Sequence, residues 1–474
     1  MIKTDERGME RVPGSFRDPS GSVYQQGDCI IRSITSLGQK EWQQFLSSGL
    51  LDTLQERALL QHTQRVPLDL FLDVFGSDSD VVDVVEHRRI PFISYPYEWS
   101  FEMLKDAALA HLQLLQQCIQ KAFVTKDGTS YNIQFLGTRP IFIDPLSIIP
   151  YQTGTPWLGY RQFCQLFLFP LFLYAYKGIP FQPILRGDLE GISIPLARKF
   201  FSVGDVFKHG ILMHVFVQSL FDRTFSGSTD QTKQRITSSG FIRLEIIQRN
   251  VESLQRLVGS LSGSSCSSSW EGYQDCNSYK EKDRLLKREF VERAVKLVQP
   301  PLLYDLGCNT GEYSIIASRF AKYVVAIDED QPSIDRLYRE LKARSLGNIL
   351  PLVMNIVNPS PNQGWKLKER GSFLSRESPD MVLCLALAHH MVIGNNIPLD
   401  DVVNWIVEYS SNIVFEFVTK DDPMVRRLLL NKDDTYREYT TERLEHLFRK
   451  SCHIQERKVL SGGTRILYFL RKGI

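Results

Sequence analysis

The sequence predicts an α/β fold for the C-terminal half of this 474-residue chain, in the form of a doubly wound parallel sheet with an antiparallel edge. Two observations lead to this prediction. Short apolar runs alternate with amphipathic helical patterns over residues 276–474, and the last two runs flank Ser461-Gly462-Gly463, which signals a hairpin. The half before it lacks this alternation and predicts an α+β domain.

The elements expected in the C-terminal half follow one another in regular order. Strands are expected near residues 302–306, 323–327, 349–354, 380–385 and 412–418, followed by the hairpin strands 453–460 and 464–471. Helices are expected near residues 312–321, 332–344, 400–409 and 440–450. Seven strands with this alternation suit a parallel sheet that ends in an antiparallel pair.

The N-terminal half predicts shorter and less regular elements. They are a turn-rich hairpin over 16–34, a mostly helical stretch over 42–62, a short strand that runs into a turn over 90–96, a long amphipathic helix over 101–123, and a strand over 141–143 that ends at Asp144. The most apolar run, residues 163–176, is too short to cross a bilayer and predicts a buried helix.

The composition of the chain indicates its domain boundaries and limits the classes of partner and the cellular compartment that we expect. A serine-rich stretch near 259–269 predicts a linker, so we expect domains at 1–235 and 276–474 joined by a helix and a linker or lid at 236–275. The net charge is +2 and no long basic run is present, which argues against a nucleic-acid partner. The eight cysteines show no paired metal spacing, and the N-terminus does not resemble a signal peptide, so we expect a cytoplasmic protein with reduced thiols.

The most informative segment is Leu302–Gly311, which combines an apolar strand, a glycine turn and the start of a helix. The next strand ends in an acid, Asp328. Glycines allow the backbone to approach a ligand closely, and the acid accepts hydrogen bonds from ribose hydroxyls. The segment therefore predicts a binding unit of the nucleotide type.

The spacing Asp305-x-Gly307-x-x-x-Gly311 resembles motif I of the class I S-adenosylmethionine (SAM) methyltransferases, over about residues 270–474. The resemblance implies a Rossmann-like fold, SAM as cofactor, and ribose hydroxyls bound by Asp328. The remaining cofactor-binding positions that it implies are Asp305, Gly307, Cys308, Asn309 and Gly311 at the methionine part, Asn355 near the adenine amine, and Leu385 at the carboxyl end of the fourth strand. Many family members have glycine at Asn309, and asparagine tolerates the same left-handed backbone.

Candidate catalytic residues follow the fourth and fifth strands. His389 and His390 titrate near neutral pH and are candidate general bases, although a paired histidine can also only shape the pocket. Glu416 is a further candidate, with a structural role as the alternative. Tyr279, with Trp270 and Tyr273, is expected either to form a lid over the cofactor or to pack in the core.

Two motifs that the sequence lacks narrow the chemical class of the methyl acceptor. The motif typical of amino-group methylation on bases does not follow the fourth strand, and no cysteine has the setting typical of pyrimidine methylation. We therefore expect a methyl acceptor with an oxygen or nitrogen nucleophile, either a small molecule or a saccharide. In-line transfer to such a group chiefly requires positioning.

A second candidate site lies in the N-terminal half. Asp127, Asn132 and Asp144 resemble the catalytic and metal loops of protein-kinase-like folds, which implies ATP with Mg²⁺ held by Asn132 and Asp144. Three features depart from that pattern. Thr125 or Lys126 replaces the His-Arg or His-Gly that usually precedes the catalytic Asp, and Asp144 is followed by Pro-Leu. Arg32 could replace the phosphate-binding lysine, but arginine and lysine are not interchangeable there. The alternative is that these residues simply form a turn.

Over nearly its full length, the chain resembles the two-part bacterial methyltransferases related to NoeA. The segments that carry this resemblance are 17–21, 94–100, 142–144, 160–163, 385–390 and 415–418. It implies a SAM-dependent methyltransferase of secondary or cell-surface metabolism, with an N-terminal half that binds the acceptor. Two alternatives remain open: a bifunctional kinase–methyltransferase that acts on a glycan or natural product, and a SAM-binding scaffold without catalysis.

Overall fold

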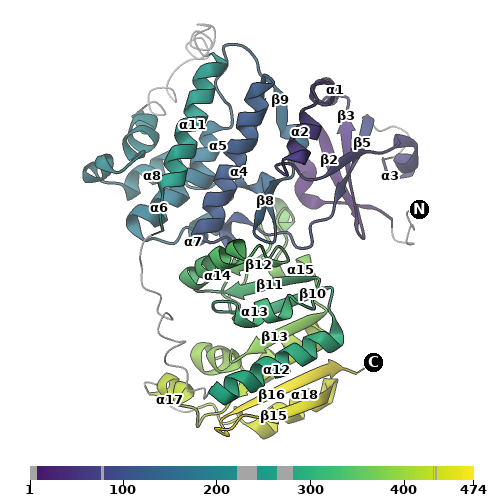
Figure 1. Cartoon of the computed structure of the whole chain (residues 1–474), viewed down its shortest axis with the longest axis vertical. Helices are drawn as coiled ribbons and strands as arrows, with labels where there is room; N and C mark the ends of the chain where they lie inside the picture. The colour runs from purple at the N-terminus through teal and green to yellow at the C-terminus, as the bar shows by residue number, and fades with distance from the viewer. Residues whose placement is uncertain are drawn as a thin grey trace. The chain divides into compact units, whose positions relative to one another are not determined.

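The computed structural model describes residues 8–75, 80–220, 243–263, 281–430, 432 and 435–473. Its contacts divide the chain into two compact units, each of which is discontinuous in sequence (Figure 1). Unit 1 consists of Met1–Phe135, Arg139–Ser265 and Asn362–Gly371, and unit 2 of Leu136–Thr138, Cys266–Pro361 and Ser372–Ile474. The domain boundaries expected at residues 235 and 275 stay a prediction.

Unit 2 contains the expected sheet. Within the described residues it has seven strands in the order β12-β11-β10-β13-β14-β16-β15. The first five pair in parallel, and β16 is antiparallel to both β14 and β15. The strands are β10 (Leu302–Leu306), β11 (Tyr323–Asp328), β12 (Ile349–Val353), β13 (Met381–Leu385), β14 (Asn412–Val418), β15 (Cys452–Val459) and β16 (Arg465–Lys472). The predicted α/β fold with an antiparallel C-terminal hairpin is confirmed.

Helices of unit 2 cover both faces of this sheet. They are α12 (Glu281–Val298), α13 (Glu312–Ala317), α14 (Gln331–Ala343), α15 (Phe373–Arg376), α16 (Leu399–Tyr409), α17 (Pro423–Leu429) and α18 (Thr441–Ser451). Apolar side chains of α12, α13 and α14 share one core cluster with every second residue of the central strands. Rings on the opposite face include Phe448 of α18, whose centroid lies 5.3 Å from that of Phe415. This layering leaves the carboxyl ends of the parallel strands at one edge, where such sheets bind ligands.

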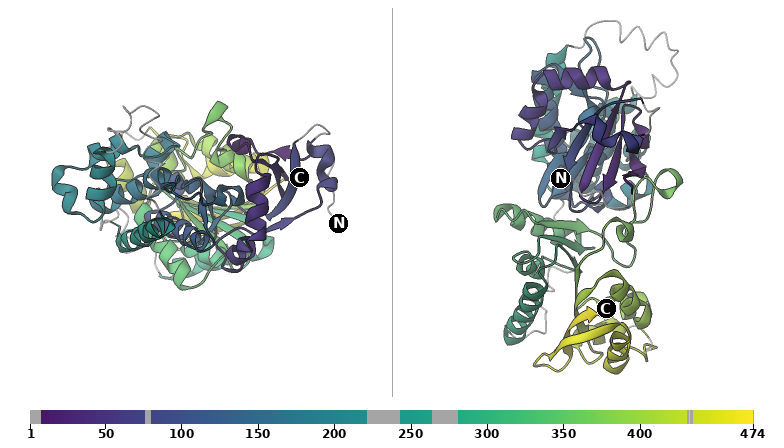
Figure 2. Two further views of the ribbon diagram at one scale, coloured as in Figure 1. Left: turned by 90° about the horizontal axis from the view of Figure 1, so that it is seen from above. Right: turned by 90° about the vertical axis from the view of Figure 1, so that its right-hand side faces the viewer.

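Unit 1 begins with an antiparallel sheet of order β1-β2-β3-β5-β4. The right-hand view of Figure 2 shows this sheet in purple and blue. Its strands are β1 (Glu10–Arg11), β2 (Gly21–Gln26), β3 (Cys29–Thr35), β4 (Thr63–Arg65) and β5 (Val81–Arg88). In the sequence, helices α1 (Gln39–Ser47) and α2 (Leu50–Glu56) lie between β3 and β4. The strand expected at 90–96 is wrong, because the chain has left the sheet after Arg88. Pro91 has no backbone N–H to contribute to a ladder.

The rest of unit 1 is mainly helical. Its long helix α4 (Phe101–Gln120) starts at Ser100, whose side chain caps the amide of Met103. The remaining elements are the strands β6 (Phe123–Thr125), β7 (Ile133–Leu136), β8 (Arg139–Phe142) and β9 (Ile148–Pro150), and the helices α5 (Tyr160–Phe163), α6 (Phe169–Lys177), α7 (Gln182–Gly187), α8 (Ile194–Phe200) and α11 (Leu244–Ser260). The apolar run 163–176 is helical and buried, as expected. No helix in the part of the chain that the structure describes is long and apolar enough to cross a membrane.

Candidate functional site

The loop between β10 and α13 turns the chain sharply at the carboxyl end of the central strand. Gly307, Asn309 and Gly311 all adopt positive φ angles, of 74°, 50° and 78°. A Cβ on Gly311 would lie 2.4 Å from the side chain of Leu337, so this position has no room for a larger residue. Asn309 takes the left-handed conformation expected of it, and its Oδ1 accepts the amide hydrogen of Thr310 at 2.7 Å.

Asp305 lies in β10 immediately before this loop and is buried. The hydroxyl of Ser314, in the first turns of α13, donates to Asp305 Oδ2 at 2.6 Å. Burial raises the pKa of Asp305 to about 6. The carboxyl group therefore ties strand and helix together beneath the loop.

Asp328 ends β11, beside the same loop. Its Oδ2 accepts from the amide of Asn309 at 2.8 Å and its Oδ1 from the amide of Asp330 at 2.9 Å. Burial raises the pKa of Asp328 to about 6, against the effect of both amides. Because each carboxylate oxygen keeps a second lone pair, the group can still accept hydrogen bonds from a ligand.

A cavity of about 350 Å³ opens at this edge of the sheet. Its wall includes, from the predicted cofactor positions, Asp305, Gly307, Cys308, Asn309, Asp328, Asn355 and Leu385. Gly311 does not line it and acts instead through the packing of the loop on α14. Asn355 follows β12 and uses its Oδ1 to accept the amide of Val357 at 2.8 Å. The structure thus brings the glycine loop and the acids and amide of three neighbouring strands around one cavity.

The histidine pair follows β13 after a tight turn in which Ala386 has a φ of 52°. His390 lines the cavity, whereas His389 is fully buried behind it, with the ring centroids 4.2 Å apart. Neither ring nitrogen of His389 has a hydrogen-bond partner within the described residues, and burial lowers its pKa well below the usual range. Of the two, His390 is the one placed to meet a ligand.

Glu416 is buried in β14 and does not line the cavity. Its carboxylate lies 2.7 Å from Nζ of Lys287 and 3.6 Å from a guanidinium nitrogen of Arg465, both of which do line the cavity. Arg465 is held in turn by Asp422, at 2.8 Å. Glu416 is therefore linked to the cavity wall by two cations, Lys287 and Arg465. Because a buried charge without a partner is costly, these groups must stay paired.

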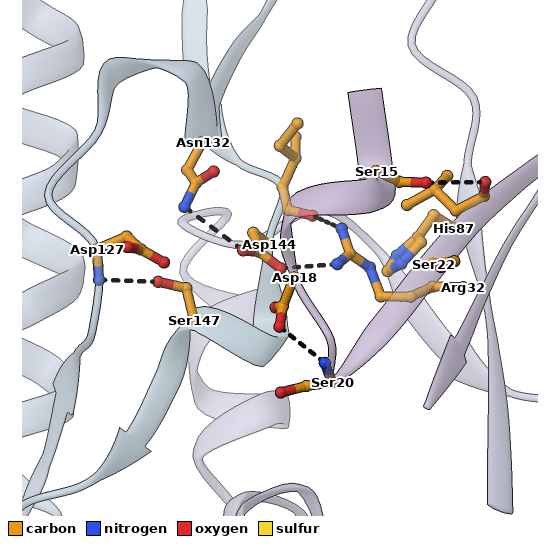
Figure 3. A network of polar contacts seen from close by, with 12 residues as sticks. Ser15, Asp18, Ser20, Ser22, Arg32, His87, Asp127, Asn132, Asp144 and Ser147 are labelled. Carbon is orange, nitrogen blue, oxygen red and sulfur yellow. Dashed lines mark hydrogen bonds and ion pairs between the residues drawn. The ribbon is translucent and has the colours of Figure 1, made fainter. Parts of the chain in front are cut away.

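The polar network expected in unit 1 is centred on Asp144 (Figure 3). Arg32 of β3 donates to Asp144 Oδ1 at 2.8 Å and to the carbonyl of Ile143 at 3.4 Å. Asn132 lies 3.5 Å from the other carboxylate oxygen. The structure therefore brings Asn132 and Asp144 together, and an arginine already neutralises the carboxylate expected to bind Mg²⁺.

Asp127 lies beside this pair, where its amide donates to Ser147 at 3.4 Å (Figure 3). Burial, with Asp144 as the next contribution, raises the pKa of Asp127. The neighbouring Lys126 forms an ion pair with Asp18 at 2.9 Å. Among the described residues, no group of three or more His, Cys, Asp or Glu side chains is arranged to hold a metal ion.

No model of a known protein family matches the sequence. The chain is 36% identical over 467 residues to the nodulation protein NoeA of Rhizobium meliloti (strain 1021), a match that covers 97% of this chain and 95% of that protein. The chain belongs to the NoeA family. The full-length resemblance expected from the sequence is thereby confirmed.

Two solved structures similar to this NoeA-family chain each cover less than half of its length. The N-methyltransferase NodS of Bradyrhizobium japonicum WM9, in complex with S-adenosyl-l-homocysteine (SAH), is 12% identical, with 43% of this chain and 98% of that chain covered and a TM-score of 0.32. WbdD is 18% identical, with 43% and 42% covered and a TM-score of 0.30.

Several cavity residues of the NoeA-family chain were not expected from its sequence. Lys287 and Arg465 line the cavity, and Tyr313 places its ring 4.4 Å from the Lys287 ammonium. Lys287 lies on the buried face of α12, where a charged residue among apolar neighbours was the available signal. Tyr279, Trp270 and Tyr273, which were expected to form a lid, lie outside the described residues.

Proposed function

We propose that unit 2 of this NoeA-family protein is a SAM-dependent methyltransferase, which acts on an oxygen or nitrogen of a small-molecule or saccharide acceptor. The observation that carries the proposal is the pairing of Asp328 with the glycine loop, in which the amide of Asn309 donates to the carboxylate at the wall of the cavity. A strand, a glycine turn and an acid at the end of the next strand together form a site for a nucleoside.

The chemistry of the cavity wall fits SAM from end to end. Asp328 offers carboxylate oxygens to the ribose hydroxyls, and Asn355 lies in the cavity wall after β12, suited to the adenine edge. At the opposite end, the loop around Gly307 offers backbone groups to the amino-acid part. Lys287 and Arg465 also line the wall, where their N–H groups can donate to the carboxylate of that part while Glu416 and Asp422 balance their charge.

SAM held by Asp328, Asn355 and the loop around Gly307 would supply an activated methyl group for transfer to the acceptor. The protein then contributes mainly position and the exclusion of water. Among the titratable residues of the cavity wall, we assign His390 to remove a proton from the acceptor. Burial lowers the pKa of His390, so the ring is neutral at neutral pH, as a base requires.

Unit 1 is proposed to bind the acceptor. A second candidate for it is a phosphotransferase site, favoured by the contact of Asn132 with Asp144. The ion pair of Arg32 with Asp144 opposes this candidate, because it occupies a carboxylate needed for Mg²⁺. ATP with Mg²⁺ should bind and lose affinity in Asp144→Asn if the second candidate holds, and titration without heat would dismiss it.

The leading proposal is tested by calorimetric titration of the full chain with SAH, followed by incubation with methyl-labelled SAM and pooled saccharide and small-molecule acceptors. We expect saturable binding of SAH at one site and transfer of label to an acceptor. Absence of SAH binding would overturn the assignment. Binding without transfer to any acceptor would favour the non-catalytic scaffold.

A further inference from the structure

The wall of the cavity after β13 includes one face of a π-helix, η10 (His390–Gly394). The lining residues from this stretch are His390, Met391, Gly394 and Asn395, so residues about one turn apart meet the cavity together. π-Helices are rare and occur frequently at functional sites. The last carbonyl groups of a helix have no partner within it, so groups from elsewhere must satisfy them.

Two side chains from the segment between α17 and α18 contact the end of η10. The ammonium of Lys432 donates to the carbonyl of Ile393 and, at 3.0 Å, to that of Gly394. The hydroxyl of Tyr436 lies 3.2 Å from the same carbonyl of Ile393 and also contacts the side chain of Asn396. A positive charge suits this end of a helix, where the carbonyl dipoles are negative. We call Lys432 and Tyr436 the clasp.

The hydrogen bonds of η10 extend this restraint back to His390. Asn395, which precedes the asparagine that Tyr436 contacts, uses its side-chain amide to donate to the carbonyl of His390 at 2.9 Å. On the side of β13, the amide of His390 donates to the carbonyl of Leu387, also at 2.9 Å. The main chain of His390 is therefore held from both directions, by the turn after β13 and by the end of η10 that the clasp secures.

The strand order places η10 away from the positions assigned to adenosine. Asp328 ends β11 and Asn355 follows β12, whereas η10 follows β13, and β10 with its glycine loop lies between them. The methyl group of SAM branches from the sulfur, which joins the adenosine to the amino-acid part. With adenosine on the side of β11 and β12 and the amino-acid part at the loop, the methyl group would point toward η10.

We propose that Lys432 and Tyr436 are positioning residues, which fix His390 opposite the methyl group and so define the acceptor side of the cavity. Neither residue lines the cavity, and both act through η10. The inference rests on the proposed function, because it assigns the methyl group to this side. It makes recognition at the reacting end of the ligand depend on residues outside the cavity wall.

The test compares two ligands that differ at the position of the methyl group. SAH has a bare sulfur there, and sinefungin has a carbon that bears an ammonium group. Calorimetric titration of the full chain gives the ratio of their affinities. Tyr436→Phe and Lys432→Met should each lower the affinity for sinefungin relative to SAH about fivefold, because His390 no longer meets the ammonium, and should leave SAH affinity within about twofold of wild type.

Tyr439→Phe is the matched control. The Tyr439 hydroxyl donates to the carbonyl of Val418 at 2.8 Å, and neither residue lines the cavity. Loss of this buried hydrogen bond should lower the unfolding temperature without changing the ratio of affinities. A purely structural role of the clasp would give the same pattern as this control. Because Lys432 is exposed, Lys432→Met keeps the test valid if Tyr436→Phe fails to fold.

His390→Phe tests whether the clasp acts through His390. This variant should lose the same relative affinity for sinefungin, and adding Tyr436→Phe should cause no further loss, because both changes remove one contact. Unchanged ratios in folded Tyr436→Phe and Lys432→Met, or losses that add to that of His390→Phe, would overturn the inference and leave the proposed function standing. A wild type that does not bind SAH would overturn both.

Discussion

Asp328 illustrates how a single residue can be prepared for a ligand before the ligand arrives. Two main-chain amides fix the direction of its carboxylate, at 2.8 and 2.9 Å. A ribose would then find its acceptor already oriented, without the entropy cost of ordering a free side chain. The carboxylate is the feature on which the assignment of the cavity depends most.

Replacing Asp328 by asparagine should weaken SAH binding by about 10- to 100-fold, because a hydrogen bond to a charged acceptor is worth about 1.5–3 kcal/mol. Calorimetric titration measures the effect, and circular dichroism checks that the variant is folded. Asp330→Asn is the control, since it is close by but does not line the cavity. Equal losses in both variants would contradict the assignment of Asp328.

The same residue predicts a pH dependence. Because burial raises the pKa of Asp328 to about 6, the ionised acceptor is abundant only above that pH. SAH affinity should therefore be constant above pH 7 and fall by up to about tenfold per unit below pH 6. The folding stability of the ligand-free protein depends on pH in the opposite direction. The contribution of Asp328 to stability is fully present below the ordinary aspartate pKa near 4, and it is lost as the pH rises through 6.

Titrations from pH 5 to 8 and denaturant unfolding over the same range test both trends. Asp328→Asn should flatten the part of each curve that belongs to this residue. A wild-type affinity that does not vary between pH 5 and 8 would contradict the prediction.

Some site residues could be predicted from local spacing and others could not. Asp305, Gly307 and Asp328 follow from the alternation of strand, turn and strand, so short-range pattern was sufficient. Lys287 and Arg465 lie far apart in sequence and meet at the cavity only after the sheet has closed. No spacing rule connects a helix before the first strand with the last strand.

At the level of elements, the glycine loop depends on the close approach of α13 and α14. A Cβ on Gly311 would overlap Leu337, and its φ of 78° disfavours any side chain. Gly311→Ala should therefore destabilise unit 2 by about 1–3 kcal/mol. Urea unfolding with and without SAH measures the loss, which ligand should partly restore.

The control for this change lies in a helix. A Cβ added to Gly259 of α11 would meet no atom within 4 Å, and this glycine is not left-handed. Gly259→Ala should leave stability unchanged or raise it by up to about 1 kcal/mol. A Gly311→Ala variant as stable as Gly259→Ala would contradict the packing described for the loop.

Strongly patterned elements were predicted closely, and irregular ones were not. The bounds of β10 and β14 match the expected ranges, because continuous apolar runs identify buried parallel strands. The strand at 90–96 was wrong, since the apolar residues there pack in a loop while β5 lies just before them. The segment 362–371 has no periodic pattern, so only long-range contacts show that it belongs to unit 1.

For the whole molecule, two units imply two sources of stability. Arg32→Met should lower the unfolding temperature of unit 1 by about 4–8 °C, because it leaves the carboxylate of Asp144 without its ion partner, a loss of about 2 kcal/mol. SAH at 100 times its Kd should stabilise unit 2 by about 2.7 kcal/mol. Differential scanning calorimetry distinguishes the two effects.

Arg65→Met is the matched control, because the Arg65 side chain in its pair with Asp83 is 63% exposed and such pairs contribute little. A common shift of the whole thermal profile in every variant would contradict independent stabilisation of the units.

Family membership was predictable across the full length, whereas the discontinuous composition of each unit was not, because it depends on contacts between distant segments.

Two short segments, 136–138 of unit 2 and 362–371 of unit 1, each lie within the sequence of the other unit. They restrict how a gene for such a protein can be rearranged. A single crossover near residue 265 would give each daughter protein an incomplete body, since 136–138 and 362–371 would remain with the wrong partner. Arg17 would then lose its ion pair with the buried carboxylate of Glu369. The contacts of Tyr95 with Gly371 and of Tyr131 with Arg370 would also be lost. Inheritance as one uninterrupted reading frame is therefore expected for proteins that share this arrangement, and fission into separately encoded halves should be selected against.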